Sequence, residues 1–143
     1  MAADLNRFLK AQAYSYDDAL AEIKAGGKRS HWIWYIFPQI TGLGMSGMAD
    51  YYAIEDIDEA RAYLANDTLR ARLVEISTAL LELESNDPLE VMGWPDNLKL
   101  RSSMTLFHEA DPSIEVFQKV LDKYYGGEPD QKTLSILEQQ KQQ

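Results

Sequence analysis

The sequence predicts a single, mainly α-helical domain, and three observations lead to this fold class. Apolar residues recur at intervals of three and four along most of the chain, which is the spacing of one face of an α-helix. Segments with this spacing begin at Ser, Asp or Asn and end at Gly or Pro, as helices do. The 143 residues suffice for one domain with a core, and no long linker divides them. We therefore expect one compact multi-helix domain over residues 1–138, with short loops, little or no sheet, and a frayed tail at 139–143.

The beginning of the chain predicts two helices before residue 28. Apolar side chains at residues 5–9 have helical spacing. Ser15 stands three positions before Asp18, which is the register of a capping box, so we expect a second helix to begin there. That helix should end at Gly26-Gly27, because glycine suits a left-handed C-terminal cap.

The stretch SHWIWYIFPQ, residues 30–39, is the most unusual part of the chain. We expect a helix that Ser30 caps and Pro38 closes. The following ITGLGMSGM has three glycines, which indicates a loop with special backbone angles or a close approach to another group. Residues 51–54 are either extended or helical.

The later helices are predicted from their starts and ends. A proline in the first turn, as in NDP, is a helix-start signal, and Gly126-Gly127 is a stop signal. We expect helices that begin at Asp56 or Asp58, at Asp67, at Asn86-Asp87-Pro88 and at Asp96 or Asn97, followed by helices over residues 114–125 and 133–137.

Composition and charge exclude several classes of function. A net charge of -9 and a pI near 4.6 are unlike those of a duplex DNA-binding protein, so we expect no bulk nucleic acid partner. No apolar run approaches the ~20 residues that cross a bilayer, and no signal peptide is recognisable. The absence of cysteine excludes disulfides and is typical of a cytoplasmic protein. Without zinc spacing or a glycine-rich phosphate motif, we expect neither a metal nor a cofactor.

The aromatic stretch contains four candidate binding residues. On a helix that begins at Ser30, His31 and Trp32 lie in the first turn, where free N–H groups favour an anion. His31 there can act as an acceptor or general base, which makes it the catalytic candidate. Trp32 and Trp34 each carry an N–H that needs a partner when buried. Gln39 stands at the mouth of the glycine loop. Each has a structural alternative, which is core packing for the tryptophans and hydrogen bonding within the fold for His31 and Gln39.

The later stretch KLRSSMTLF adds four candidates. Lys99, Ser102 and Ser103 lie along one strip of a predicted helix by three- and four-residue spacing. Helix propensity does not favour two adjacent serines. Either they allow another segment to pack closely, with their hydroxyls bonded to backbone carbonyls, or they bind a ligand. Arg101 suits a carboxylate or phosphate of a ligand, or a carboxylate of the chain itself.

Two stretches together, SHWIWYIFPQITGLGMS and PDNLKLRSSMTLF, resemble the signature segments of family 1810 of the domains of unknown function. The resemblance extends from about Leu5 to Leu137. It implies a small, mainly helical protein and assigns no activity. Members of this family are sometimes labelled calpastatin. Inhibitors of that kind are long, disordered and repetitive, so the helix caps and apolar pattern of this chain contradict the label.

Two hypotheses about function follow. In the first, the glycine loop and the helix start near residue 96 meet around an aromatic-walled pocket that binds a small anionic ligand, of the nucleotide, ADP-ribose or sugar-phosphate type. In the alternative, the protein is a non-enzymatic interaction module that presents an acidic helical surface to a protein partner. The sequence leaves open whether the protein is an enzyme.

Overall fold

Nine helices form the fold of the described residues, 4–44 and 46–142, in this computed structural model. They are α1 (Asn6–Lys24), α2 (Ile33–Ile36), α3 (Gly47–Tyr52), α4 (Ile57–Ala65), α5 (Asp67–Leu81), α6 (Pro88–Met92), α7 (Asp96–Ala110), α8 (Val116–Tyr125) and α9 (Gln131–Lys141). Within the described ranges, the β-type pairing consists of an isolated parallel bridge between Ile40 and Ile54. The mainly α-helical fold is therefore confirmed.

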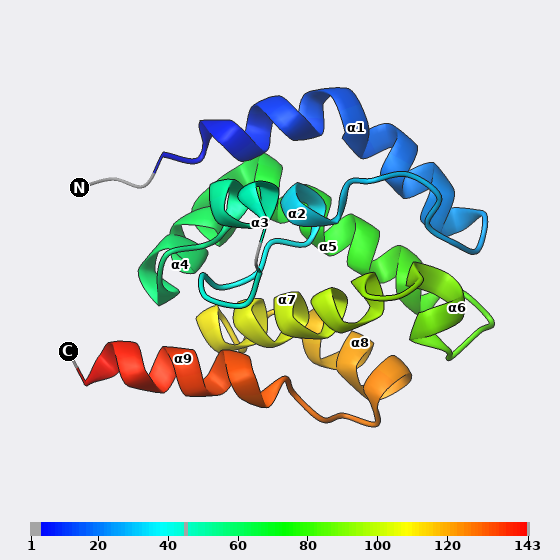
Figure 1. Ribbon diagram of the computed structural model, residues 1–143. Helices are drawn as coiled ribbons and strands as arrows, with labels where there is room; N and C mark the ends of the chain where they lie inside the picture. The colour runs from blue at the N-terminus through cyan, green and yellow to red at the C-terminus, as the bar shows by residue number, and fades with distance from the viewer. Residues whose placement is uncertain (1–3, 45, 143) are drawn as a thin grey trace.

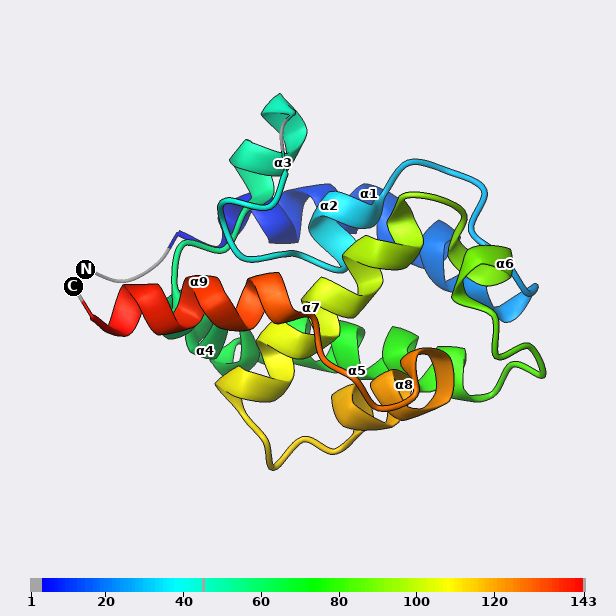
Figure 2. The same ribbon diagram turned by 60° about the horizontal axis from the view of Figure 1, so that its bottom comes forward.

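Helix α7 lies across the middle of the molecule (Figures 1 and 2). It packs against α2, α4, α6, α8 and α9, while α1 packs against α5 on the other side of the core. A helix with neighbours on so many sides must be apolar or carry small polar groups with partners. Its buried residues fit this requirement: Leu100, Ser102, Ser103, Met104, Thr105, Leu106, Phe107 and Ala110.

A row of aromatic side chains joins four helices through the core. Phe8 of α1 meets Tyr63 of α4 edge-on, with ring centroids 5.2 Å apart. Tyr63 packs on Phe107 of α7 at 5.0 Å, and Phe107 packs on Phe117 of α8 at 6.0 Å. All four rings are fully buried. Such contacts stabilise a core beyond the area that they remove from water, so this row ties the first and last thirds of the chain together.

Several predicted helix ends are confirmed by the side chains that cap them. Asp56 accepts a hydrogen bond from the Glu59 N–H, and Asp87 accepts one from the Leu89 N–H. Gly126 ends α8 with a positive φ of 63°, a conformation that glycine adopts without strain. These signals succeeded because a cap joins residues only a few positions apart.

The prediction of two helices before residue 28 is wrong, because α1 continues through Ser15. Its buried face consists of Phe8, Gln12, Tyr16, Ala19 and Ile23. The polar members of that face hide the continuous spacing in the sequence. Gln12 is buried because its amide donates to the Tyr35 carbonyl at 2.8 Å and to the Tyr63 hydroxyl at 3.0 Å.

The predicted helix over the aromatic stretch is shorter than expected, and Ser30 does not cap it. Helix α2 begins at Ile33, after Trp32, and no side chain caps it. The Ser30 hydroxyl instead bonds to Glu22 of α1 at 2.7 Å. His31 and Trp32 therefore precede the helix and do not form its first turn.

The remaining differences concern the glycine loop and the C-terminal helix. Residues 47–52 are helical, and Ile54 then pairs with the segment after Pro38, so both alternatives for this region occur. Helix α9 begins at Gln131 and continues to Lys141. Residues 139–141, which the sequence places in a frayed tail, form its last turn, and Gln140 donates to the Glu55 carbonyl at 2.9 Å.

Replacement of Asp130 by alanine is expected to loosen α9. The Asp130 Oδ2 atom lies 3.1 Å from the Thr133 N–H nitrogen, 2.6 Å from its hydroxyl and 3.0 Å from the Ser102 hydroxyl. Loss of this cap should lower the free energy of unfolding by about 1–3 kcal/mol in urea denaturation. The control is Asp67→Ala, whose side chain is 92% exposed and should change stability by less than about 0.5 kcal/mol. Equal effects of the two substitutions would contradict the role assigned to Asp130.

Candidate functional site

The carboxylate of Glu22, at the end of α1, holds the segment before α2 in place. Its Oε1 atom accepts from the N–H groups of Arg29 at 2.6 Å and Ser30 at 2.8 Å, and from the Trp32 indole at 3.0 Å. Its Oε2 atom accepts from the Ser30 hydroxyl. Burial alone raises the pKa of Glu22, but these four donors outweigh it and lower the pKa from 4.5 to about 2. Glu22 is therefore ionised at neutral pH and anchors this segment.

Trp32 and His31, two of the four candidates in the aromatic stretch, make contacts that belong to the fold itself. Trp32 is buried and its indole N–H is satisfied by Glu22, so it packs in the core. His31 is exposed, and its contact with the Tyr35 hydroxyl at 3.5 Å is made through the backbone carbonyl. Among the described residues, none forms a hydrogen bond or ion pair with the His31 ring to orient it as a general base.

Two candidates on α7 hold the segment that leads into α9. The Arg101 Nε donates to the Glu128 carbonyl at 3.0 Å, and its guanidinium lies over the Tyr125 ring. The Ser102 hydroxyl is buried between the Leu98 carbonyl at 3.2 Å and Asp130 Oδ2 at 3.0 Å. Arg101 and Ser102 thus form hydrogen bonds within the fold, which the sequence analysis gave as the alternative to ligand binding.

Two candidates, Trp34 and Lys99, come together near α2, and we call them the Trp34–Lys99 surface. The Lys99 ammonium lies 5.6 Å from the centroid of the Trp34 ring. Ser103 is one turn further along α7. The Trp34 Nε1 and Ser103 Oγ atoms are buried and have no hydrogen-bond partner among the described residues. Buried polar groups in proteins are usually paired, so these two atoms call for an explanation.

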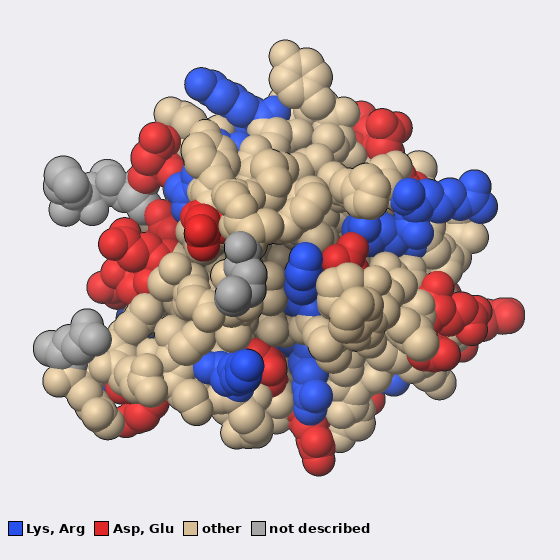
Figure 3. Space-filling model, in the orientation of Figure 1, with Lys and Arg blue, Asp and Glu red and all other residues tan. Residues whose placement is uncertain are grey.

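The charge around this surface is set by one carboxylate and two ammonium groups. Asp96 Oδ2 lies 2.7 Å from the Lys28 ammonium, and Asp96 Oδ1 lies 3.7 Å from the Lys99 ammonium. The Lys28 ammonium also lies 5.1 Å from the Trp32 ring centroid. Figure 3 shows a column of basic side chains over α7, whereas acidic side chains gather toward both edges of the same face. Taken together, Lys28, Lys99 and Asp96 carry one excess positive charge.

In the described residues, the aromatic-walled pocket that the sequence predicts is reduced to a small hollow. Trp34 and Gln39 do line one hollow, together with Gly42, Gly44 and neighbouring residues, but its volume is only about 10 Å³. That is room for one water molecule. Lys99, Arg101, Ser102 and His31 are not part of its lining. A ligand would meet Trp34 and Lys99 from the surface and would not be enclosed.

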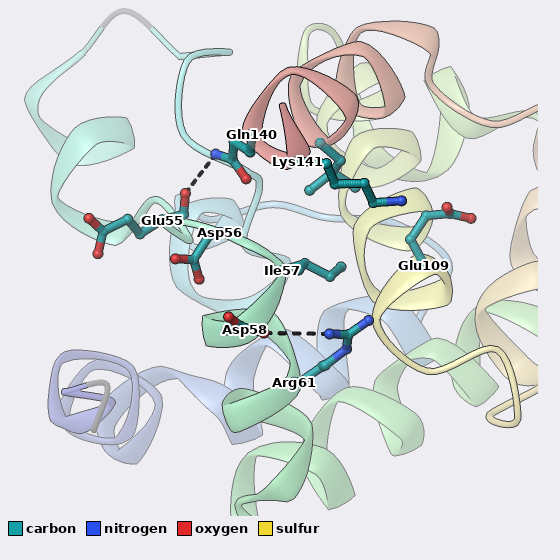
Figure 4. A pocket seen from close by; sticks show the side chains of 9 residues that line it. Glu55, Asp56, Ile57, Asp58, Arg61, Glu109, Gln140 and Lys141 are labelled. Carbon is teal, nitrogen blue, oxygen red and sulfur yellow. Dashed lines mark hydrogen bonds and ion pairs between the residues drawn. The ribbon is translucent and has the colours of Figure 1, made fainter. Parts of the chain in front are cut away.

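A larger hollow, of about 520 Å³, lies between α4, α7 and α9 (Figure 4). Figure 4 shows Glu55, Asp56 and Asp58 on one side of it and Glu109 and Lys141 on the other. A neighbouring hollow of about 710 Å³ shares the first three of these carboxylates. Seven carboxylates and three basic side chains line the two hollows: Asp4, Asp50, Glu55, Asp56, Asp58, Glu59 and Glu109, with Arg7, Arg61 and Lys141.

The sequence reasoning did not identify these acidic residues as site candidates. The available signal was the run EDIDE at residues 55–59, which reads equally well as a helix start with a solvated face. Across residues 4–44 and 46–142, no three His, Asp or Glu side chains are grouped so that they could hold a metal ion. None of the described helices has the length and apolar character needed to cross a membrane.

The comparisons with known proteins agree with the fold. A family model described as "Protein of unknown function (DUF1810)" matches residues 2–137. The chain belongs to this family. No curated protein matches the chain.

A solved structure from the same comparisons shows the fold independently. The crystal structure of the conserved hypothetical protein Rv1873 from Mycobacterium tuberculosis is similar over 94% of this chain and 96% of that chain. The two are 44% identical, and their TM-score is 0.92. The description of that protein names no ligand or activity, so the function of this chain has to be argued from its own residues.

Substitution of Glu22 by glutamine should destabilise the protein at neutral pH by about 1–3 kcal/mol, because charge-assisted hydrogen bonds are lost. The Glu22 pKa is lowered on folding, so its contribution is complete above the unfolded value of 4.5 and is lost as the pH falls through about 2. The stability difference between wild type and variant should therefore shrink over that range in urea denaturation.

The matched control is Glu138→Gln, on an exposed part of α9. It should show little difference at any pH. A Glu22→Gln difference that stays constant from pH 7 to pH 2 would contradict the assignment of the lowered pKa to this carboxylate.

Proposed function

We propose that the protein binds a small anionic molecule at the Trp34–Lys99 surface. The observation that carries this proposal is the buried Trp34 Nε1 donor, which lacks a partner among the described residues and belongs to the ring beside the Lys99 ammonium. The Lys99 ammonium offers an anionic oxygen a charge-assisted contact at the surface, and the Trp34 N–H offers a second contact once the ligand displaces the side chains that cover it. The exposed part of the Trp34 ring adds a flat apolar surface for a base or sugar.

The local charge supports an anion even though the protein as a whole is acidic. Two ammonium groups share one carboxylate here, whereas the net charge of the chain is -9. A basic site within an acidic protein favours a compact anion over a long polyanion, because distant carboxylates repel the extended charge. This reasoning favours single nucleotides, ADP-ribose and sugar phosphates over DNA or RNA.

The proposal concerns binding. A general base needs a neighbour that orients it, and no hydrogen bond or ion pair joins the His31 ring to another described residue. Gln39 and Trp34 both border the 10 Å³ hollow. We assign Gln39 a contact with the hydroxyl or amide groups of the ligand.

A second candidate function is supported by the acidic hollows on α4. Seven carboxylates face only three basic side chains there, and Arg61 already pairs with Asp58 at 3.4 Å. Such a surface repels anions and attracts a partner that is rich in lysine or arginine. This corresponds to an interaction module with an acidic helical surface, and it can exist together with the anion site because the residues do not overlap.

The first proposal predicts that Lys99→Ala removes ligand-induced stabilisation. A nucleotide, ADP-ribose or sugar phosphate at about a hundred times its dissociation constant should add about 2.7 kcal/mol, which raises the melting temperature by roughly 5–10 °C. Lys99→Ala should abolish this rise while it changes the unliganded melting temperature little. Lys119→Ala, an exposed lysine of α8, is the matched control and should retain the rise. The proposal fails if no such compound stabilises the wild type, or if both variants respond alike.

The second candidate predicts binding of a labelled oligolysine peptide in fluorescence anisotropy at low salt. The double variant Glu55→Gln/Asp58→Asn should weaken this binding about 3- to 10-fold, because each carboxylate contributes to the attraction. The exposed pair Asp17→Asn/Asp18→Asn on α1 has the same change of charge and should have a smaller effect. Equal losses in the two double variants would show attraction by net charge alone.

A further inference from the structure

Asp96 is shared unequally by the two lysines. Its Oδ2 atom is 2.7 Å from the Lys28 ammonium, but its Oδ1 atom is 3.7 Å from the Lys99 ammonium, at the outer limit of an ion pair. The exposed fractions of the side chains follow the same order, with Lys28 at 6%, Asp96 at 16% and Lys99 at 24%. The inner pair is therefore tight and nearly dry, and the outer pair is long and open to water.

Lys28 is held firmly in this position. Its ammonium lies over the Trp32 ring, and its backbone N–H donates to the Val91 carbonyl at 2.8 Å. A nearly buried ammonium needs its counter-ion, so Asp96 stays with Lys28. Lys99 is less restrained, because its side chain is 24% exposed, against 6% for Lys28, and its ammonium lies 3.7 Å from Asp96 instead of 2.7 Å.

The position of Asp96 is also one that suits an anion. It lies in the first turn of α7, and the residue before that helix, Pro95, provides no side-chain cap. The N-terminal end of a helix stabilises negative charge. The Asp96 carboxylate thus occupies a place where the helix end and two ammonium groups converge.

We propose that Asp96 is a built-in competitor for the anion-binding site, and that the anionic group of a ligand displaces it from Lys99 while it remains paired with Lys28. This inference rests on the proposed binding of an anion at the Trp34–Lys99 surface. Asp96 then sets the affinity and the charge preference of the site. With Asp96 present, Lys28, Lys99 and Asp96 together carry one excess positive charge and favour a singly charged anion. Without the Asp96 carboxylate, the affinity for a doubly charged phosphate increases most.

The experiment compares the binding of AMP to wild type, Asp96→Asn and the double variant Lys28→Gln/Asp96→Asn. The three tryptophans give three indole N–H signals in a ¹H–¹⁵N correlation spectrum, and a Trp34→Phe sample identifies the one that reports on the site. Adenosine serves as the uncharged control. The melting temperature of each variant shows that it is folded, which matters because Asp96→Asn leaves the nearly buried Lys28 without its counter-ion.

The double variant separates competition from simple charge. It removes one positive and one negative charge, so its local charge equals that of wild type, and it leaves no unpaired buried lysine. If Asp96 competes with the ligand, the Trp34 signal should saturate at about 5- to 50-fold lower AMP concentration in Asp96→Asn. It should also saturate at a lower concentration in the double variant than in wild type.

Each other result overturns a defined part of the argument. If wild type binds AMP and neither variant binds it more tightly, Asp96 does not compete with the ligand, and the proposed binding stands. If Asp96→Asn binds more tightly but the double variant matches wild type, the effect is one of charge, and competition is again wrong. If AMP shifts the Trp34 signal in none of the three proteins, or adenosine shifts it equally, both the competitor and the anion site are wrong.

Discussion

The burial of α7 on nearly all sides is the constraint on which the rest of the structure depends. Helices pack closely around it only if its side chains are apolar or small, and each small hydroxyl must then find a partner. Ser102 does so at Asp130, and the Thr105 hydroxyl accepts from the Asp130 N–H at 2.9 Å while it donates to the Arg101 carbonyl. These bonds position the start of α9. Ser103 is the hydroxyl of this group that remains without a described partner, and it lies on the side of Lys99.

The sequence predicted the fold well where the deciding interaction is local. Asp56 and Asp87 cap helices as expected, because donor and acceptor are two or three residues apart. Ser15 and Ser30 have the same capping chemistry, yet neither caps a helix. Ser15 accepts from the Tyr35 hydroxyl and Ser30 donates to Glu22, both partners that lie distant in sequence. A residue type thus predicts what a side chain can do, and long-range contacts decide what it does.

The same distinction limits how much of the candidate site could be predicted. Aromatic, basic and hydroxyl residues were chosen as groups that need partners. The partners of Trp32 and Arg101, which are Glu22 and the Glu128 carbonyl, depend on how distant segments meet. The sequence therefore could not separate residues that the fold already satisfies from those, such as Trp34, that it leaves unpaired. Asp96 was considered as a helix start and as a partner of Arg101, but not as a partner of Lys28, because Lys28 and Asp96 lie far apart in the sequence.

The bridge between Ile40 and Ile54 gives the segment around α3 a degree of independence. Two backbone hydrogen bonds of 2.8 Å join the two ends of the segment that contains α3. The Thr41 N–H donates to the Ile54 carbonyl, and the Ile54 N–H donates to the Gln39 carbonyl. No residue of α3 is buried, and Tyr52 provides its aromatic contacts with Phe8 and with the ring of the α2 tyrosine. Because these hydrogen bonds hold the two ends of the segment together without α3, side chains of α3 can be substituted at little cost to the core. The side chains that border the Trp34 ring can therefore change while the helical scaffold beneath stays the same.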